Sequence, residues 1–260
     1  MTIDVLESLP LDRLRPVDLL DVLARAELLE RVDRKYLVPV GVAAAVMGEL
    51  SADHHVLVVN GRRTTHYRTT YFDTDNRICI RDHVMGRRRR FKARSRLYVE
   101  DGLCRLEVKT KHPRGGTTKV QVDMASDARG ELTEAHQRFI EETLAHNGVP
   151  TPSPLRKSFE VTCCRATVVD LAGGVRITFD RDVTCSDGSQ SVSLDPSHVI
   201  VETKGSMRAS RADALLWRAG YRPRSFSKYA ALGAVLDPTI SDNGVRRLLG
   251  NQLHYQGATR

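Results

Sequence analysis

The sequence predicts an α+β fold dominated by antiparallel strands, and three observations lead to this prediction. Runs of about ten residues alternate between apolar and polar side chains, which is the period of a strand with one buried face. Short turn signals separate neighbouring runs, for example at 101–102 and 173–174, and such turns favour antiparallel hairpins. A helical pattern follows each of two groups of strands, at 131–147 and at 209–220.

Taken in order, the chain is expected to begin with an acidic region, residues 1–30, with an amphipathic helix over 16–30 that a proline opens. A single domain follows over 31–237, and a polar tail occupies 238–260. The domain is expected to contain a strand at 34–40, a short helix at 41–50, strands at 54–59 and 64–74, a helical crossover at 76–85, a meander of strands at 88–99, 103–111 and 117–125, a helix at 131–147, strands at 156–170, 174–184 and 198–204, and helices at 209–220 and 227–236.

The composition predicts a soluble, folded protein. Of the 260 residues, 41% are hydrophobic and 28% are charged, which is typical of a globular chain and unlike a disordered one. The five cysteines are odd in number and include no C-x-x-C spacing, which favours free thiols in a reducing cytosol. The N-terminus has no basic region followed by an apolar run, and no window approaches 18 apolar residues. We therefore expect a cytoplasmic protein without a signal peptide or a membrane span.

Positive charge is concentrated in one part of the chain. The net charge is +8, yet residues 1–30 carry seven acids against three arginines, and residues 86–119 carry twelve lysines and arginines against three acids. Such a local excess indicates a phosphate-rich partner. The stretch GRRRRFKARSRLYVE (86–100) has four interpretations: a disordered basic arm, a nucleic-acid surface, a solvated sheet face, or one wall of a polyanion site.

Alternation within this stretch argues against a disordered arm, because opposite faces of a strand receive different side chains. One face receives the cations Arg88, Arg90, Lys92, Arg94 and Arg96, and the other receives Phe91, Ala93, Ser95, Leu97 and Val99. Polar faces of the neighbouring runs carry Arg105, Glu107, Lys109 and Lys111, then Lys119, Gln121 and Asp123, then Arg176, Thr178 and Asp180, and finally Glu202 and Lys204.

Repulsion within such a row limits where it can lie. Two cations about 6 Å apart repel by ~3 kcal/mol at an effective dielectric near 20. A row of five in a confined space would exceed the usual stability margin of roughly 5–15 kcal/mol. The row must therefore face bulk water, as in an ordinary one-sided sheet, or bind anions. If the sheets close into a barrel, these faces would line a lumen suited to a polyanion, whereas a nucleic-acid site would need them to face outward.

Two carboxylates and one helix start stand out among these charges. Glu107 and Glu202 are either ion-pair partners of the neighbouring cations or ligands of a hard divalent cation, which takes one or two carboxylates and phosphate oxygens. Ser227 and Lys228 lie at the start of an expected helix. The free N–H groups of its first turn either bind a phosphate, or Ser227 serves only as an ordinary N-cap residue. The sequence contains no G-x-x-x-x-G-K-[ST], G-x-G-x-x-G or G-x-S-x-G motif, which excludes P-loop phosphate binding.

Nine short motifs, in their order along the chain, resemble the VTC domain, a polyphosphate polymerase domain of the CYTH-like triphosphate tunnel metalloenzymes. The motifs are RVDRKYLV (31–38), TTYFDT (69–74), FKARSRLY (91–98), LEVKTK (106–111), TTKVQV (117–122), CCRATV (163–168), VRITFD (175–180), VETKG (201–205) and SKYAALG (227–233). The resemblance extends from about residue 30 to residue 237, and it implies a closed antiparallel β-barrel, a tunnel lined by Arg, Lys and Glu, with helices packed around the outside.

The resemblance also implies roles for individual residues. Catalytic cations would be Lys35, Arg94, Arg96, Lys109, Arg165 and Arg176; further phosphate-binding residues would be Lys92, Lys119, Lys204, Ser227 and Lys228; and Glu202 would hold Mn²⁺ or Mg²⁺, with Glu107 as a possible second carboxylate. The implied activity is metal-dependent transfer of the γ-phosphoryl group of a nucleoside triphosphate, ATP, onto polyphosphate. The expected partners are therefore ATP and polyphosphate, and nucleic acid is not expected to bind.

Two other functions are kept as alternatives, namely a tripolyphosphatase or nucleoside triphosphatase of the same fold, and a non-catalytic polyphosphate-binding module. Triphosphatases of this group begin with an E-x-E-x-K strand. Here Arg31 replaces the first acid, and only Asp33 and Lys35 keep the later part of the pattern. Fewer carboxylates favour the polymerase over a two-metal hydrolase. The sequence shows no SPX-type helical module, so the regulation that such a module provides is not implied.

Overall fold

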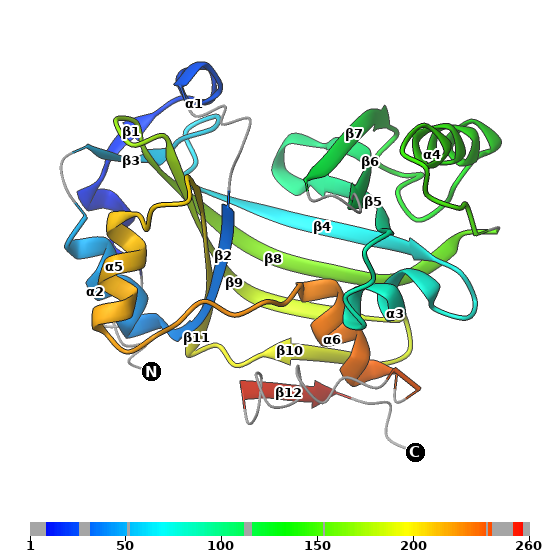
Figure 1. Cartoon of the computed structure of the whole chain (residues 1–260). Helices are drawn as coiled ribbons and strands as arrows, with labels where there is room; N and C mark the ends of the chain where they lie inside the picture. The colour runs from blue at the N-terminus through cyan, green and yellow to red at the C-terminus, as the bar shows by residue number, and fades with distance from the viewer. Residues whose placement is uncertain are drawn as a thin grey trace. The chain divides into compact units, whose positions relative to one another are not determined.

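The computed structural model describes residues 9–25, 32–50, 53–111, 116–152, 154–237, 239–240 and 252–256 (Figure 1). The chain forms two compact units. Unit 1 comprises residues 1–65, 164–182 and 194–225, and unit 2 comprises residues 66–163, 183–193 and 226–260. The long strands β8 (Arg156–Asp170) and β9 (Val175–Ser186) contribute residues to both units.

Unit 1 contains β1 (Arg15–Val17), α1 (Leu19–Arg25), β2 (Val32–Pro39), α2 (Val40–Gly48), β3 (His54–Leu57), β11 (His198–Gly205) and α5 (Arg211–Arg218), with a short 3-10 turn at Leu11–Arg13. Strand β11 pairs antiparallel with both β2 and β9. Strand β3 pairs antiparallel with β8 and parallel with β1.

The core of unit 1 follows from the alternation along its strands. Tyr36 and Val38 of β2 and Val199 and Val201 of β11 are fully buried in one cluster with residues of α2 and α5. These two helices pack against each other, as Figure 1 shows. Apolar side chains of alternate positions therefore face the helices, and the intervening charged residues lie on the other face of the strands.

Unit 2 contains most of β4 (Thr64–Asp73), α3 (Ile78–Val84), β5 (Arg90–Tyr98), a 3-10 turn at Val99–Asp101, β6 (Leu103–Lys111), β7 (Thr117–Met124), α4 (Glu134–His146), β10 (Ser191–Leu194), α6 (Lys228–Leu236) and β12 (Leu253–Gln256). Strands β4, β5, β6 and β7 form an antiparallel meander in this order. Helix α4 begins at a capping box. The Thr133 hydroxyl oxygen accepts a hydrogen bond from the His136 N–H, and the His136 ring accepts one from the Thr133 N–H.

The buried face of the meander is the one that the sequence predicted. Phe91 and Ala93 of β5 and Leu106 of β6 are buried together with Ile140 and Leu144 of α4. The alternate residues of β5 are only half-buried. The cations of β5 thus share the face opposite the helix-covered core, which confirms the alternation as that of a strand.

The mostly antiparallel α+β fold is confirmed, but closure into a barrel is not. The hydrogen-bonded order is β12-β10-β9-β8-β4-β5-β6-β7, with β11, β2, β3 and β1 attached beside this path. The described strands therefore form a branched sheet whose hydrogen-bonded pairings do not close into a ring. Within the described part of the chain, no helix has the length and apolar character needed to cross a membrane.

The start of the first helix and two short strands differ from the prediction. Pro16 does not open a helix; it lies in the short strand β1, and the helix begins only at Leu19, because a residue without an N–H is tolerated in a three-residue strand at a sheet edge. Residues 26–30 of the predicted helix and Arg31 lie outside the described residues. Strand β12 lies within the region expected to be a polar tail, and β10 was not predicted at all. Both have only four residues, which is too short for a clear alternation.

Candidate functional site

Antiparallel register aligns the charges of β5, β6 and β7 into rows that cross the meander of unit 2. The rows are Arg90–Lys111–Thr117, Lys92–Lys109–Lys119, Arg94–Glu107–Gln121 and Arg96–Arg105–Asp123. The second row consists only of lysines. Like charges directly opposite each other destabilise a sheet, so this row is suited to water or a bound anion above it.

Glu107 is the buried carboxylate in this cationic face. Its side chain is 2% exposed. It accepts a hydrogen bond from Arg94 Nε at 2.7 Å and forms an ion pair with Lys119 Nζ at 2.5 Å. Burial opposes ionisation, but the charges of Arg94, Arg96 and Lys119 outweigh it and hold the pKa of Glu107 well below its usual range. Burial lowers the pKa of Lys119, against the attraction of Glu107. Glu107 therefore stays ionised and orients its cations.

Two aromatic rings support the arginines of β5. Arg94 Nη1 donates to the Tyr71 hydroxyl at 3.2 Å, and the Arg94 guanidinium lies 5.9 Å from the centre of that ring. Arg96 lies 5.3 Å from the centre of the Tyr67 ring. Tyr71 in turn stacks on Tyr229 of α6, with ring centres 4.2 Å apart. Packing on rings restricts the orientation of both guanidinium groups.

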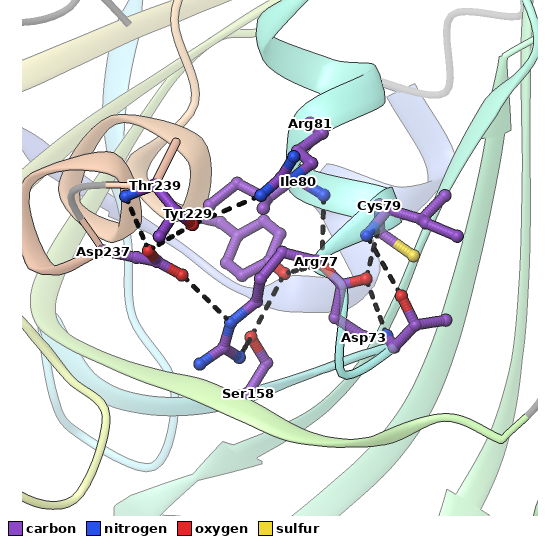
Figure 2. A network of polar contacts seen from close by, with 11 residues as sticks. Asp73, Arg77, Cys79, Ile80, Arg81, Ser158, Tyr229, Asp237 and Thr239 are labelled. Atoms are coloured by element: carbon purple, nitrogen blue, oxygen red, sulfur yellow. Dashed lines mark hydrogen bonds and ion pairs between the residues drawn. The ribbon is translucent and has the colours of Figure 1, made fainter. Parts of the chain in front are cut away.

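Figure 2 shows the polar network that holds Tyr229 in place. Asp73, 1% exposed, accepts hydrogen bonds from the backbone N–H groups of Cys79 (2.8 Å) and Ile80 (3.0 Å) and from the Tyr229 hydroxyl (2.7 Å). Burial, together with the Asp73 charge, raises the pKa of Tyr229 well above its usual value. Arg77 extends the network by donating to Ser158 Oγ at 2.5 Å. One carboxylate thus joins the end of β4, the start of α3 and the first turn of α6.

The start of α6 carries the predicted pair Ser227 and Lys228. Ser227 Oγ accepts a hydrogen bond from the N–H of Ala230 at 3.1 Å and so acts as an N-cap. Lys228 is the first helical residue, and its Nζ lies 3.9 Å from Cys163 Sγ. The geometry gives Ser227 a structural role, and phosphate binding by this pair stays a prediction.

A second charged cluster lies in unit 1 around Glu202. Glu202 Oε1 accepts from Lys204 Nζ at 2.6 Å and from Lys35 Nζ at 3.1 Å, and Lys204 also donates to Asp33 Oδ2 at 3.0 Å. The register of β2 against β11 explains this contact, because Glu202 lies opposite Lys35 and Lys204 opposite Asp33. Burial disfavours the charge of Glu202, but Lys204, Lys35 and Arg165 hold the pKa of Glu202 well below its usual range.

Arg165 and Arg176 belong to the same unit. Arg165 forms a two-point ion pair with the buried Asp180, with Nε to Oδ1 at 2.5 Å and Nη2 to Oδ2 at 2.8 Å. Arg176 lies directly opposite Lys204 in the β9–β11 pairing. The predicted site residues therefore gather in two sets: Lys35, Arg165, Arg176, Glu202 and Lys204 in unit 1, and Lys92, Arg94, Arg96, Glu107, Lys109, Lys119, Ser227 and Lys228 in unit 2.

Four residues of these clusters were not predicted to have a role there. Asp180 lies on the same face of β9 as Arg176, and this alternation could have indicated it. Its ion pair with Arg165 depends on the pairing of β8 with β9, which the local sequence does not give. Tyr71 and Asp73 lie within the motif TTYFDT, and Tyr229 follows Lys228 directly. Their contacts join segments that are far apart in the sequence, and no local pattern indicates such contacts.

The carboxylates suit one divalent cation better than two. In the described ranges, no three or more His, Cys, Asp or Glu side chains gather into a metal-binding group. Asp33 and Glu202 nevertheless share one positive charge, the ammonium group of Lys204. Two carboxylates that contact the same ammonium group, with Lys35 as a further partner of Glu202, fit at most one divalent cation that also takes phosphate and water oxygens. Glu107, expected as a second ligand, lies in the other unit and has its own cationic partners.

A comparison with curated proteins gave no match. Among solved structures, a putative adenylyl cyclase from Hippeastrum, described as having a dominant triphosphatase activity, is similar at 14% identity with a TM-score of 0.46, over 79% of this chain and 96% of that chain. The PH1819 protein from Pyrococcus horikoshii OT3 is similar at 13% identity with a TM-score of 0.43, over 81% and 99% of the two chains.

The family model described as VTC domain matches residues 30–236, which is most of the sequence. This range includes every strand of the two charged clusters. The chain therefore belongs to the VTC domain family.

Proposed function

We propose that the protein is a metal-dependent polyphosphate polymerase, which transfers the γ-phosphoryl group of ATP onto the end of a polyphosphate chain. Membership of the VTC domain family supports this proposal. The single observation that carries it is the cationic face of the meander, in which rows of lysines and arginines surround one buried, ionised carboxylate. Such a face suits a ligand with many closely spaced negative charges.

Phosphoryl transfer requires mainly positioning and charge stabilisation from a protein. Arg94 and Arg96 would contact phosphoryl oxygens through two N–H groups each, since their side chains are restricted by Tyr71 and Tyr67. The lysines of the second row would supply mobile point charges. Glu107 would hold the side chains of Arg94 and Lys119 in fixed directions, because its carboxylate contacts both.

The proposed metal would be held by Glu202 and Asp33. A divalent cation held by these carboxylates would supply positive charge that stabilises a bound phosphoryl group. Lys35 and Lys204 keep the Glu202 carboxylate ionised and in position, so that it is ready to exchange an ammonium partner for a metal ion. Arg165, held by Asp180, adds positive charge next to this carboxylate.

The proposal is tested with γ-³²P-labelled ATP, Mn²⁺ or Mg²⁺ and a short polyphosphate primer, with products sized on a gel. The wild-type protein should extend the primer, and Glu202→Gln should lower the rate by about 100-fold to 1000-fold, as when one group that stabilises the transition state is lost. Glu49→Gln is the matched control, because Glu49 is an exposed carboxylate that pairs with the exposed Arg218. Folding of each variant is checked by circular dichroism. If no labelled polymer forms with either metal, the polymerase proposal fails.

A triphosphate hydrolase of the same fold is the second candidate. Asp33 lies beside the Glu202 cluster through Lys204, and this second carboxylate favours a hydrolase over a function that needs no carboxylate. The same reaction mixtures distinguish the two, because a hydrolase releases labelled orthophosphate without chain growth. In that case Asp33→Asn and Glu107→Gln should be as harmful as Glu202→Gln. A non-catalytic binding module would bind polyphosphate and show neither product.

A further inference from the structure

Three consecutive arginines connect helix α3 to strand β5 and take no part in the clusters described above. Arg87, Arg88 and Arg89 are all exposed. They precede Arg90, the first residue of β5 and a member of the first cationic row. They therefore add positive charge directly before the first cationic row of the meander.

The backbone of this turn is fixed by hydrogen bonds. Gly86 has a φ of +67°, which is favourable for glycine, and its N–H donates to the carbonyl of His83 at 3.3 Å. The N–H of Arg87 donates to the carbonyl of Asp82 at 2.9 Å, which completes the pattern of a glycine-ended helix. Arg90 Nη1 then donates to the carbonyl of Arg87 at 2.5 Å. A turn ordered in this way presents its side chains without a large ordering cost on binding.

The charges of the turn are only partly compensated. Asp82 is electrostatically coupled to Arg87 and Arg90, and Arg87 Nη2 also contacts Met85 Sδ at 3.9 Å. The ion pairs formed among the described residues do not include Arg88 or Arg89. These two arginines are therefore the members of the turn best able to bind an external anion.

The two cross-strand rows that follow the turn contain no carboxylate residue. From Arg88 toward Glu107, the cross-strand rows are Arg90–Lys111–Thr117 and Lys92–Lys109–Lys119. Arg90 precedes Arg94 by four positions, which corresponds to about 13 Å along the strand, and Arg88 lies two residues before Arg90 in the turn. A ligand that contacts both Arg94 and Arg88 must therefore be longer than a triphosphate.

We propose that Arg88 and Arg89, with the carboxylate-free rows beside them, form an outer binding site for the body of a polyphosphate chain. The inference rests on the proposed function, because it assumes that the Arg94–Glu107 row holds the shorter, reacting part of the ligand. Binding at both places by one molecule raises its affinity as a two-site ligand does. The protein then binds long polyphosphate more tightly than tripolyphosphate.

Polyphosphate fits this outer site better than a nucleic acid does. Single-stranded nucleic acids bind cationic grooves in which aromatic side chains stack on the bases. The two carboxylate-free rows contain only arginine, lysine and threonine, and the turn adds only arginines. Phosphate contacts without stacking partners favour a ligand that consists of phosphate alone.

The test measures the affinity of the wild-type protein and of the Arg88→Gln/Arg89→Gln double variant for tripolyphosphate and for a long polyphosphate of defined length, by calorimetry at low salt. Loss of two exposed cationic contacts is expected to weaken the binding of long polyphosphate by about 5-fold to 30-fold, while the affinity for tripolyphosphate stays within about twofold of the wild-type value. The loss should shrink at high salt, because exposed charges are screened. The control is Arg138→Gln/Arg208→Gln, which removes two exposed arginines elsewhere.

Each outcome bears on one of the two proposals. Equal loss of both affinities in the double variant, or no loss of long-chain affinity, would overturn the outer site. Equally tight binding of duplex DNA of the same total charge, lost in the same variant, would also overturn it in favour of a nucleic-acid surface. If the wild-type protein binds long polyphosphate through Arg88 and Arg89 but does not bind tripolyphosphate, the outer site stands and the proposed catalytic function fails.

Discussion

At the scale of single residues, Glu107 compensates the charge of the cationic face, and its removal should be costly. Glu107→Gln keeps the shape of the side chain but leaves Arg94 and Lys119 without their anion. Breaking a buried ion pair costs about 3–5 kcal/mol, and the lower end is expected here because Lys119 is 43% exposed. Urea unfolding measures the loss. Asp123→Asn is the control, since Asp123 is 83% exposed beside Arg105 and should cost under about 1 kcal/mol.

The same residue predicts how stability depends on pH. Burial opposes the ionised form of Glu107, yet neighbouring cations hold its pKa below that of the unfolded chain. A group whose pKa is depressed on folding contributes stability above its unfolded pKa, and this contribution is lost as pH falls toward the folded value. Wild-type stability should therefore fall between about pH 5 and about pH 3, and Glu107→Gln should fall less steeply. Identical pH profiles of the unfolding free energy would contradict the assigned ion pairs.

At the scale of elements, one hydroxyl group adds a hydrogen bond to the packing that anchors α6. Tyr229→Phe keeps the stack on Tyr71 but removes the hydrogen bond to Asp73 (Figure 2). A buried acceptor that loses a partner costs about 1–3 kcal/mol, so thermal unfolding should occur at a clearly lower temperature. Tyr221→Phe removes a hydroxyl from a partly buried tyrosine and should have a small effect. Equal melting temperatures for wild type and Tyr229→Phe would show that the hydroxyl does not anchor the helix.

The elements also show how far the sequence determines the fold and the candidate site. Alternation along 88–99 predicted both the strand and its buried face, because a period of two is a local property. The partner of Glu107 required the register of β5 against β6, and register depends on the turn and on the whole buried face. The contact of Asp73 with Tyr229 joins residues 156 positions apart. Short strands such as β10 exist mainly through pairing, so their own sequences give little signal.

At the scale of the whole molecule, the cationic rows imply that a bound polyanion should stabilise the folded chain. A ligand that binds only the folded chain stabilises it by ~2.7 kcal/mol at a hundredfold excess over its dissociation constant. Tripolyphosphate should therefore raise the unfolding free energy more than orthophosphate does at matched ionic strength. Denaturant titrations with and without ligand measure this difference.

Lys109→Gln separates binding from a structural role of the lysine row. Lys109 lies opposite both Lys92 and Lys119, so its removal relieves repulsion and should raise the stability of the ligand-free protein by roughly 0.2–1 kcal/mol. The same variant should gain less stability from tripolyphosphate, because one phosphate contact is lost. A purely structural lysine would give the reverse result, namely a less stable protein with an undiminished response to the ligand. Opposite signs of the two effects would therefore identify the row as a polyanion-binding surface.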